Sequence, residues 1–400
     1  MGAFSYYHHN MKSTLKIGLP IFLAAVNMRA GLVVINPLLP ILKDEYHLST
    51  FVQSLFSAIP LICFASTAII MRYINRLGDT NRVITVALGV LAFSLFMRAT
   101  FGIPTLLLFS ISMGIAIATL NYMLPVWLKE NGGNKSGLLT GTYVAIMGTC
   151  VSISLAIAVP LAHATSIGWR LSMVPWIITG TLAAIWWFIK MPHKSHNDNY
   201  QAAPHFFANP LLKNKSAWAI TLFFGLISMV FYATSTWGPT ILVSKGFTLT
   251  HSAWIVSISN LIGSILGIFI PHYVSKKSDM RAALVFLSML IALSFLGVGL
   301  DHGNRIIIWM ILANIGMAIC FPLSLLLAVL RGSDPVQTRL LSIMMQSVGY
   351  LMAAVSPTIM GAIFDTSSSW PVALMFVVVL GALQALISWE VGKSKKIAAV

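Results

Sequence analysis

The chain has 400 residues, of which 58% are hydrophobic and 9% are charged, with a mean hydropathy of +0.86. Soluble domains carry about 25% charged residues, so this composition excludes a soluble protein and indicates one that crosses a lipid bilayer many times. A net charge of +15 would suggest a nucleic-acid partner in a soluble chain. Here the basic residues fall in short segments between apolar runs, where they set membrane topology, and we expect no nucleic acid.

Twelve apolar runs are long enough to cross the hydrocarbon core as helices. They fall at residues 15–41, 50–71, 83–101, 104–128, 137–163, 171–191, 217–243, 252–274, 281–300, 305–330, 338–364 and 371–392. The first run is too long for a signal peptide, so we expect it to be retained as a helix.

The distribution of basic residues predicts how the chain is oriented. With a cytoplasmic N-terminus, nineteen of the 25 Lys and Arg residues fall on the cytoplasmic side and five fall outside, while Arg29 lies within the membrane. The positive-inside rule therefore predicts that both termini are cytoplasmic.

One long polar stretch, rich in His, Asn and Pro, interrupts the apolar runs in the middle of the chain. It predicts a six-helix bundle over residues 1–191, a cytoplasmic linker over 192–216 and a second six-helix bundle over 217–400. The histidines of this stretch match no metal-ligand spacing, and we assign neither a metal nor a cofactor. They are His193, His196 and His205.

The two groups of six runs resemble each other at an offset of about 200 residues, so that Gly114 matches Gly316 and Lys129 matches Arg331. Internal repetition of this kind predicts two parallel bundles related by an axis along the membrane normal. The substrate is then expected between them, near the middle of the membrane.

Arg29 lies thirteen residues after Lys16 and fourteen before Lys43, and within the apolar runs Asp or Glu occurs only as Glu390, two residues before the end of the last run. Its guanidinium is roughly 20 Å from either lysine, too deep to reach water from a lipid-facing position. It must face the protein interior or an aqueous cavity. An anionic ligand would neutralise it, and the planar guanidinium suits two coplanar oxygens. The alternative is a structural lock, in which it donates to backbone carbonyls of neighbouring helices.

Other polar residues within the runs are candidates for lining the substrate path. Asn36 follows Arg29 by seven residues, which places both on one face of a continuous helix. A helix–helix contact is the alternative for Asn121, Tyr143 and Asn314, and a place at the membrane interface is the alternative for Trp237. The predicted substrate-binding residues are Arg29, Asn36, Asn121, Tyr143, Tyr232, Trp237, Asn314, Gln346 and Tyr350.

The segment after the second run reads Arg72-Tyr-Ile-Asn-Arg-Leu-Gly-Asp-Thr-Asn-Arg82. It resembles the major facilitator loop G-x-x-x-D-R-x-G-x-x-R, with Met71 and Asn75 in place of its Gly and Asp and with Arg82 one residue beyond its last Arg. This resemblance implies an all-α integral membrane protein of twelve transmembrane helices in two six-helix pseudo-symmetric bundles. It also implies that Arg76, Gly78 and Arg82 belong to a loop that controls conformational change.

Within that superfamily the chain resembles the cyanate and nitroimidazole porter family. The segments that carry this resemblance are Asn27-Met28-Arg29, 37–40, 114–125, 137–141, 231–237 and 334–350. The resemblance implies transport of a small anion or a polar heteroaromatic molecule. The sequence holds no nucleotide-hydrolysis, metalloprotease or hydrolase motif. We therefore expect a transporter driven by gradients, with an intramembrane enzyme or receptor as the rival class.

We thus expect a secondary active or facilitative transporter of a small organic or inorganic anion, cyanate-like or carboxylate-like, working by alternating access as a monomer in the cell inner membrane. The alternative is an exporter of neutral heteroaromatic or drug-like compounds such as nitroimidazoles, in which Arg29 polarises a nitro or carbonyl group. All ten acidic residues map to loops or helix ends, so a proton relay is poorly supplied. We predict anion exchange or outward facilitated flux.

Overall fold

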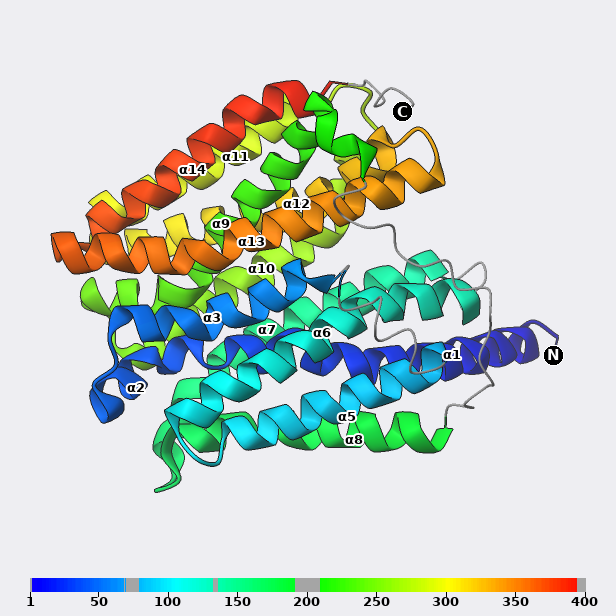
Figure 1. Cartoon of the computed structure of the whole chain (residues 1–400), viewed down its shortest axis with the longest axis horizontal. Helices are drawn as coiled ribbons and strands as arrows, with labels where there is room; N and C mark the ends of the chain where they lie inside the picture. Colours follow the sequence, from blue (N-terminus) through cyan, green and yellow to red (C-terminus); the bar gives the residue numbers. More distant parts are fainter. Residues whose placement is uncertain (1, 68, 70–78, 132–135, 191–208, 394–400) are drawn as a thin grey trace.

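The computed structural model describes residues 2–67, 69, 79–131, 136–190 and 209–393, and helices make up most of this part of the chain (Figure 1). In these residues eleven helices are long and apolar enough to cross a membrane. A further apolar helix, α3 (Thr50–Ala65), is shorter within the described part. The expectation of twelve membrane-crossing helices is confirmed.

Two groups of helices form the fold, which we call the N-terminal half and the C-terminal half. The N-terminal half holds α1 (Gly2–Val33), η1 (Asn36–Leu38), α2 (Leu39–Tyr46), α3, α5 (Thr80–Arg98), α6 (Ile103–Asn131), α7 (Ser136–Ala164), η4 (Gly168–Met173) and α8 (Val174–Lys190). The C-terminal half holds η6 (Pro210–Lys213), α9 (Lys215–Ser244), α10 (Leu249–Ser275), α11 (Arg281–Leu300), α12 (Arg305–Arg331), α13 (Pro335–Ser367) and α14 (Trp370–Val391).

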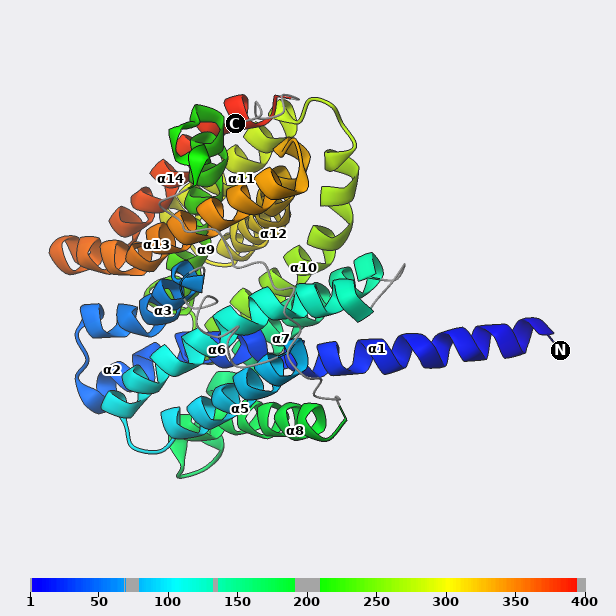
Figure 2. The same ribbon diagram turned by 45° about the vertical axis from the view of Figure 1, so that its right-hand side comes forward.

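Each half packs mainly within itself. In the first, α1 packs on α7 and α8, and α5 packs on α6 and α8; in the second, α9 packs on α13 and α14, and α11 on α12 and α14. The halves meet along two seams, α3 against α13 and α7 against α10. The turned view shows the same two groups, with the start of α1 extending beyond the rest (Figure 2).

Several helices begin at a short polar residue that caps free backbone N–H groups. The Asp79 carboxylate accepts from Arg82 N at 3.2 Å, and the Asp334 carboxylate accepts from Gln337 N at 2.8 Å. Such caps satisfy donors that have no partner within the helix. Three of the acidic residues outside the spans thus have a local role, since Asp279 also accepts from Arg281 N at 2.9 Å.

The first span is not the continuous helix that the sequence predicts. Helix α1 ends at Val33, and the chain continues through η1 and the short α2. Pro37 and Pro40 explain the break, because neither can donate the backbone hydrogen bond that would continue the helix. The prediction that Arg29 and Asn36 share a face of one continuous helix was therefore wrong. Both residues nevertheless contact α9, as described below.

Helix α10 lies very close to α12. A Cβ added to Gly263 would lie 2.7 Å from Asn314 O, and one added to Gly267 would lie 2.5 Å from Ala318 O. Glycine is required at both positions, because any side chain would collide with the backbone of α12. Small residues spaced in this way commonly allow two membrane helices to approach closely.

A row of hydrogen bonds joins the halves on the side opposite the start of α1 and the end of α14 (Figure 1). Along the first seam, Thr50 Oγ1 donates to Asp365 Oδ1 at 2.6 Å, and the hydroxyls of Ser54 and Thr358 are 2.8 Å apart. Along the second seam, Asn260 Nδ2 donates to the Ser152 hydroxyl at 2.9 Å, and Trp254 Nε1 donates to Ala156 O at 3.0 Å. These bonds hold the halves together on that side.

Candidate functional site

Helix α1 has one partly accessible face, and this face ends at Arg29. Leu19, Phe22, Val26 and Arg29 follow each other at intervals of three or four residues, and each keeps part of its surface exposed. From Ala30 onward every residue is buried until residue 39. Arg29 therefore lies at the inner end of an accessible surface that begins toward the start of α1.

The guanidinium of Arg29 is surrounded by aromatic side chains from several helices. Its Nη1 donates to the Tyr232 hydroxyl on α9 at 3.2 Å, and its Cζ lies 5.7 Å from the centre of the Phe321 ring on α12. It also interacts electrostatically with the hydroxyls of Tyr350 on α13 and Tyr143 on α7. The structure thus brings together four of the nine predicted residues, the arginine and all three tyrosines.

Other basic residues within or beside the helices have a different kind of partner. Arg98, which is fully buried, donates from Nη1 to Gly31 O at 2.8 Å, close to the end of α1. Lys245 donates to Gly299 O at 2.7 Å, at the end of α11. Arg331 donates to Gly392 O at 3.3 Å, at the end of α14. The C-terminal end of a helix carries a partial negative charge and unpaired carbonyls, so each of these cations has an electrostatic partner.

Arg29 has no such partner. Its contacts are neutral hydroxyls and an aromatic ring, and no carboxylate forms an ion pair with it among the residues that the structure describes. A positive charge that is largely enclosed by protein and has no counter-charge is costly. The described surroundings of Arg29 therefore leave its charge uncompensated.

Asn36 forms a second contact between α9 and the broken first span. Its Nδ2 donates to Ser235 O at 3.0 Å and to the Ser235 hydroxyl at 3.2 Å. Its Oδ1 is buried without a hydrogen-bond partner. Asn36 thus lies beside the Arg29 contact on α9, one turn further along that helix, with one acceptor unused.

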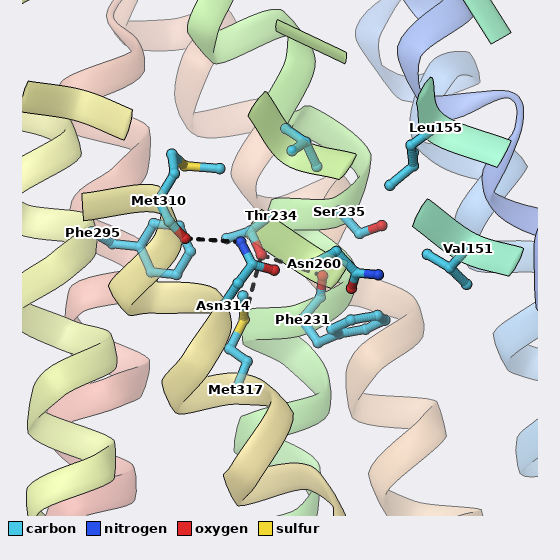
Figure 3. A pocket seen from close by; sticks show the side chains of 11 residues that line it. Val151, Leu155, Phe231, Thr234, Ser235, Asn260, Phe295, Met310, Asn314 and Met317 are labelled. Atoms are coloured by element: carbon cyan, nitrogen blue, oxygen red, sulfur yellow. Dashed lines mark hydrogen bonds between the residues drawn. The ribbon is translucent and has the colours of Figure 1, made fainter. Parts of the chain in front are cut away.

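A small cavity, lined in part by Phe231, lies between α9, α10, α12 and α7 (Figure 3). Its volume is about 20 Å³, enough for one water molecule. Thr234, Ser235, Asn260 and Asn314 supply its polar lining. The Asn314 amide donates to Met310 O at 3.0 Å within its own helix, so Asn314 faces this cavity and is not among the contacts of Arg29.

The remaining predicted residues lie elsewhere. Trp237 is 1% exposed, donates from Nε1 to Pro357 O at 2.8 Å and packs against Trp370, so it lies inside the C-terminal half and not at a membrane interface. Asn121 on α6 and Gln346 on α13 are half-buried. Arg82 is exposed in the first turn of α5. Arg76 and Gly78 lie outside the described residues.

The sequence pattern of the Major Facilitator Superfamily matches residues 21–357 of the chain. The chain belongs to the Major Facilitator Superfamily. The same fold appears in a crystal structure of a bacterial homolog of the human lysosomal transporter Spinster, in an inward-facing and unoccupied conformation. The TM-score is 0.79 at 14% sequence identity, with 96% of this chain and 97% of that chain covered.

Two relatives place this major facilitator protein beside the family that the sequence resembles. The 2-nitroimidazole transporter of Escherichia coli (strain K12) is 29% identical over 94% of this chain and 95% of its own length. The cyanate transport protein CynX of the same organism is 23% identical over 88% of this chain and 91% of its own length. The predicted family resemblance is confirmed.

Sequence reasoning missed two features of this major facilitator site. Arg98 was counted among the residues outside the membrane, although it is 0% exposed inside the N-terminal half. Its position three residues before the end of the third apolar run was the available signal. Phe231 and Phe321 carried no signal, because phenylalanine is common throughout these helices.

Proposed function

We propose that the chain is a secondary active or facilitative transporter of a small organic or inorganic anion, cyanate-like or carboxylate-like. The observation that carries this proposal is the contrast among the basic residues within or beside the helices. Arg98, Lys245 and Arg331 each donate to the carbonyl end of a helix, whereas Arg29 meets only neutral groups. A monovalent anion at Arg29 would supply the missing counter-charge, with the tyrosine hydroxyls as further donors.

Transport would occur by alternating access, through rocking of residues 1–191 against residues 217–400. Two features support this mechanism. The accessible face of α1 approaches Arg29 from the side of the termini, and the hydrogen bonds between α3 and α13 close the other side. With both termini cytoplasmic in the cell inner membrane, as the basic residues predict, this state would be open to the cytoplasm. The two halves lie in one chain, and we propose a monomer.

Export of neutral heteroaromatic compounds is a second candidate function. The specific observation in its favour is the similarity to a protein named as a 2-nitroimidazole transporter. In that case Arg29 would polarise a nitro or carbonyl oxygen, and no counter-charge would enter the site.

Binding measured at two pH values tests the anion proposal against the neutral one. Purified protein in nanodiscs would be titrated with a weak organic acid at one pH below and one pH above the acid's own pKa. The anion proposal is supported if binding becomes stronger when the acid is ionised and is lost in the Arg29→Gln variant. Equal binding of the neutral and ionised forms, unchanged in Arg29→Gln, would overturn it and favour the neutral compound.

A further inference from the structure

We infer that the Arg29 site selects flat aromatic monoanions over aliphatic anions of equal charge and size. This inference rests on the proposed anion transport and specifies its substrate class. Three observations support it: the aromatic rings around the guanidinium, the accessible surface of two of these rings, and the single positive charge of the site.

The aromatic side chains near Arg29 form one connected cluster, which we call the aromatic collar. Tyr232 packs against Phe231 with ring centres 5.1 Å apart, and Phe231 packs against Phe321 at 6.2 Å. The ring centre of Phe224 lies 5.6 Å from that of Phe321 and 5.4 Å from that of Tyr350, so Phe224 links the two. The members of the collar are Phe64, Phe224, Phe231, Tyr232, Phe321 and Tyr350.

Only part of the collar is available to a ligand. Phe64, Phe224, Tyr232 and Tyr350 are buried, whereas Phe231 and Phe321 keep some exposed surface. The planes of these two rings are 39° apart and their centres are 6.2 Å apart. A ligand ring stacked between two others would need about twice the usual spacing of roughly 3.5 to 4 Å between carbon atoms in contact. The two phenylalanines therefore form one continuous wall, against which a flat ring can pack.

The wall lies directly beside the charge. Phe321 is the ring that the Arg29 Cζ contacts at 5.7 Å, and Phe231 adjoins Tyr232, which accepts the Arg29 hydrogen bond. An aromatic acid can therefore place its carboxylate at Arg29 while its ring meets the wall. Phe231 also lines the cavity of about 20 Å³, so part of its surface is not covered by other side chains.

The charge of the ligand follows from the count of charged groups. Arg29 is one cation, and Arg98, Lys245 and Arg331 already have helix-end partners. A dianion would leave one charge without a partner, and among the described residues no carboxylate is paired with Arg29 to receive the ammonium of an amino acid. A single negative charge on a flat ring fits best.

The test compares four ligands by calorimetric titration of the full-length protein in nanodiscs at pH 7.5. Benzoate is a flat anion, cyclohexanecarboxylate is an anion of the same size without a flat ring, acetate is an anion without a ring, and benzamide is flat and neutral. We expect benzoate to bind roughly tenfold more tightly than cyclohexanecarboxylate, since aromatic contacts add to the free energy of area burial. Acetate and benzamide should bind more weakly than either.

A matched pair of variants assigns this preference to the wall. Phe321→Leu keeps an apolar side chain but removes the ring. It should reduce the preference for benzoate over cyclohexanecarboxylate to about twofold in affinity. Phe93→Leu is the control, because Phe93 is 56% exposed on α5 and pairs with Phe109, apart from the collar. It should leave this preference unchanged. Melting temperatures of both variants show that each is folded.

The outcomes separate this inference from the proposal on which it rests. If both ring acids bind equally and Arg29→Gln abolishes both, the aromatic preference is overturned while anion transport stands. If benzamide binds as tightly as benzoate and Arg29→Gln retains both, the anion proposal itself is overturned. Absence of benzoate binding at millimolar concentration, in protein with an unchanged melting temperature, also overturns the aromatic preference.

Discussion

The Nη1 atom of Arg29 on α1 donates a hydrogen bond to the hydroxyl of Tyr232 on α9, and this 3.2 Å contact joins the two halves of the protein. It lies where the accessible face of α1 ends. Any rocking of one half against the other must lengthen this bond or carry both residues along. The proposed ligand binding and the proposed movement of the halves would therefore act on the same pair of atoms.

Replacing Arg29 should separate a binding role from a structural one. We expect Arg29→Ala to weaken anion binding by about 2 to 5 kcal/mol, roughly 30-fold or more, because a charge-assisted contact is lost. Arg29→Lys should recover little, since an ammonium lacks the planar arrangement of donors. Titration calorimetry and a melting curve on the same samples check both statements. Normal binding with a lowered melting temperature would identify Arg29 as a structural lock.

Smaller losses in binding are expected from changes at Tyr232, which contacts Arg29, and at Gln346 on α13. Tyr232→Phe removes one neutral hydroxyl, which is worth about 0.5 to 1.5 kcal/mol in a typical hydrogen bond. Gln346→Ala, one turn before Tyr350 on α13, should also bind more weakly than wild type but better than Arg29→Ala. Affinities measured side by side on the three variants test this order, which fails if Gln346→Ala is the weakest binder.

Arg98 should show the opposite behaviour to Arg29. Its Nη1 contact with Gly31 O holds the end of α1, so Arg98→Ala leaves a buried carbonyl unpaired and a space behind it. We expect a loss of about 1 to 3 kcal/mol in the free energy of unfolding. Thermal melting in nanodiscs gives the direction of the change. Unchanged melting combined with lost anion binding would instead place Arg98 in the binding site.

A disulfide across the α3–α13 seam should stop transport. The hydroxyls of Ser54 and Thr358 are 2.8 Å apart on opposite halves, close enough for Ser54→Cys and Thr358→Cys to form a bond with little movement. Cys63, Cys150 and Cys320 would first be replaced to prevent other pairings. We expect uptake into proteoliposomes to cease on oxidation and to return on reduction.

A control disulfide within one half distinguishes a blocked movement from general damage. Ser288 on α11 and Ser388 on α14 have hydroxyls 3.2 Å apart in the C-terminal half. The corresponding cysteine pair should form under the same conditions without loss of transport. Continued transport by the oxidised Ser54→Cys, Thr358→Cys protein would contradict movement of the halves at this seam.

Orientation in the membrane can be decided by impermeant labelling of single cysteines. Ser216→Cys, at the start of α9, should react only after the cytoplasmic side is exposed, whereas Ser367→Cys, at the end of α13, should react in intact cells. Both serines are exposed, so either position can be reached by reagent. The reverse labelling pattern would invert the predicted topology.

Counter-flow should reveal how transport is coupled. An inside-negative potential opposes entry of an anion by about 2.3 kcal/mol per 100 mV, and the described Asp and Glu residues lie at helix ends or in connections. We expect that proteoliposomes preloaded with unlabelled benzoate take up labelled benzoate faster than empty ones. A pH gradient alone should not concentrate a substrate that stays ionised. Accumulation driven by that gradient and abolished by a protonophore would require a proton relay.

Composition and the lengths of the apolar runs were sufficient to predict the membrane-crossing helices, because a membrane forces an apolar run of this length into a helix. The arrangement of these helices was implied by the internal repeat and by the family resemblance. The sequence was also sufficient to select Arg29 as a candidate site residue, since a charged side chain in the middle of a membrane is costly and commonly marks a functional site. The same logic failed for Arg98, which lies near the end of its run, where a long side chain normally reaches water. Whether such a residue turns inward depends on which helix packs beside it.

The break in the first span shows a second limit. Pro37 and Pro40 lie just after the end of α1. The sequence does not reveal that the chain forms the short helix η1 there and then continues as α2. The aromatic collar is a third case, since Phe231, Phe321 and Tyr350 are far apart in the chain and meet only through the packing of α9, α12 and α13. Such tertiary neighbours carry no local pattern.

The pairing of Arg98, Lys245 and Arg331 with helix-end carbonyls has a consequence for a cell whose interior acidifies. A peptide carbonyl has no proton to gain in the physiological range, whereas a carboxylate partner can be neutralised and leave its arginine alone. These three contacts are therefore made with acceptors that do not titrate in the physiological range. We expect acidification to leave these three hydrogen bonds in place, whereas it would reduce the ionised fraction of a weakly acidic substrate.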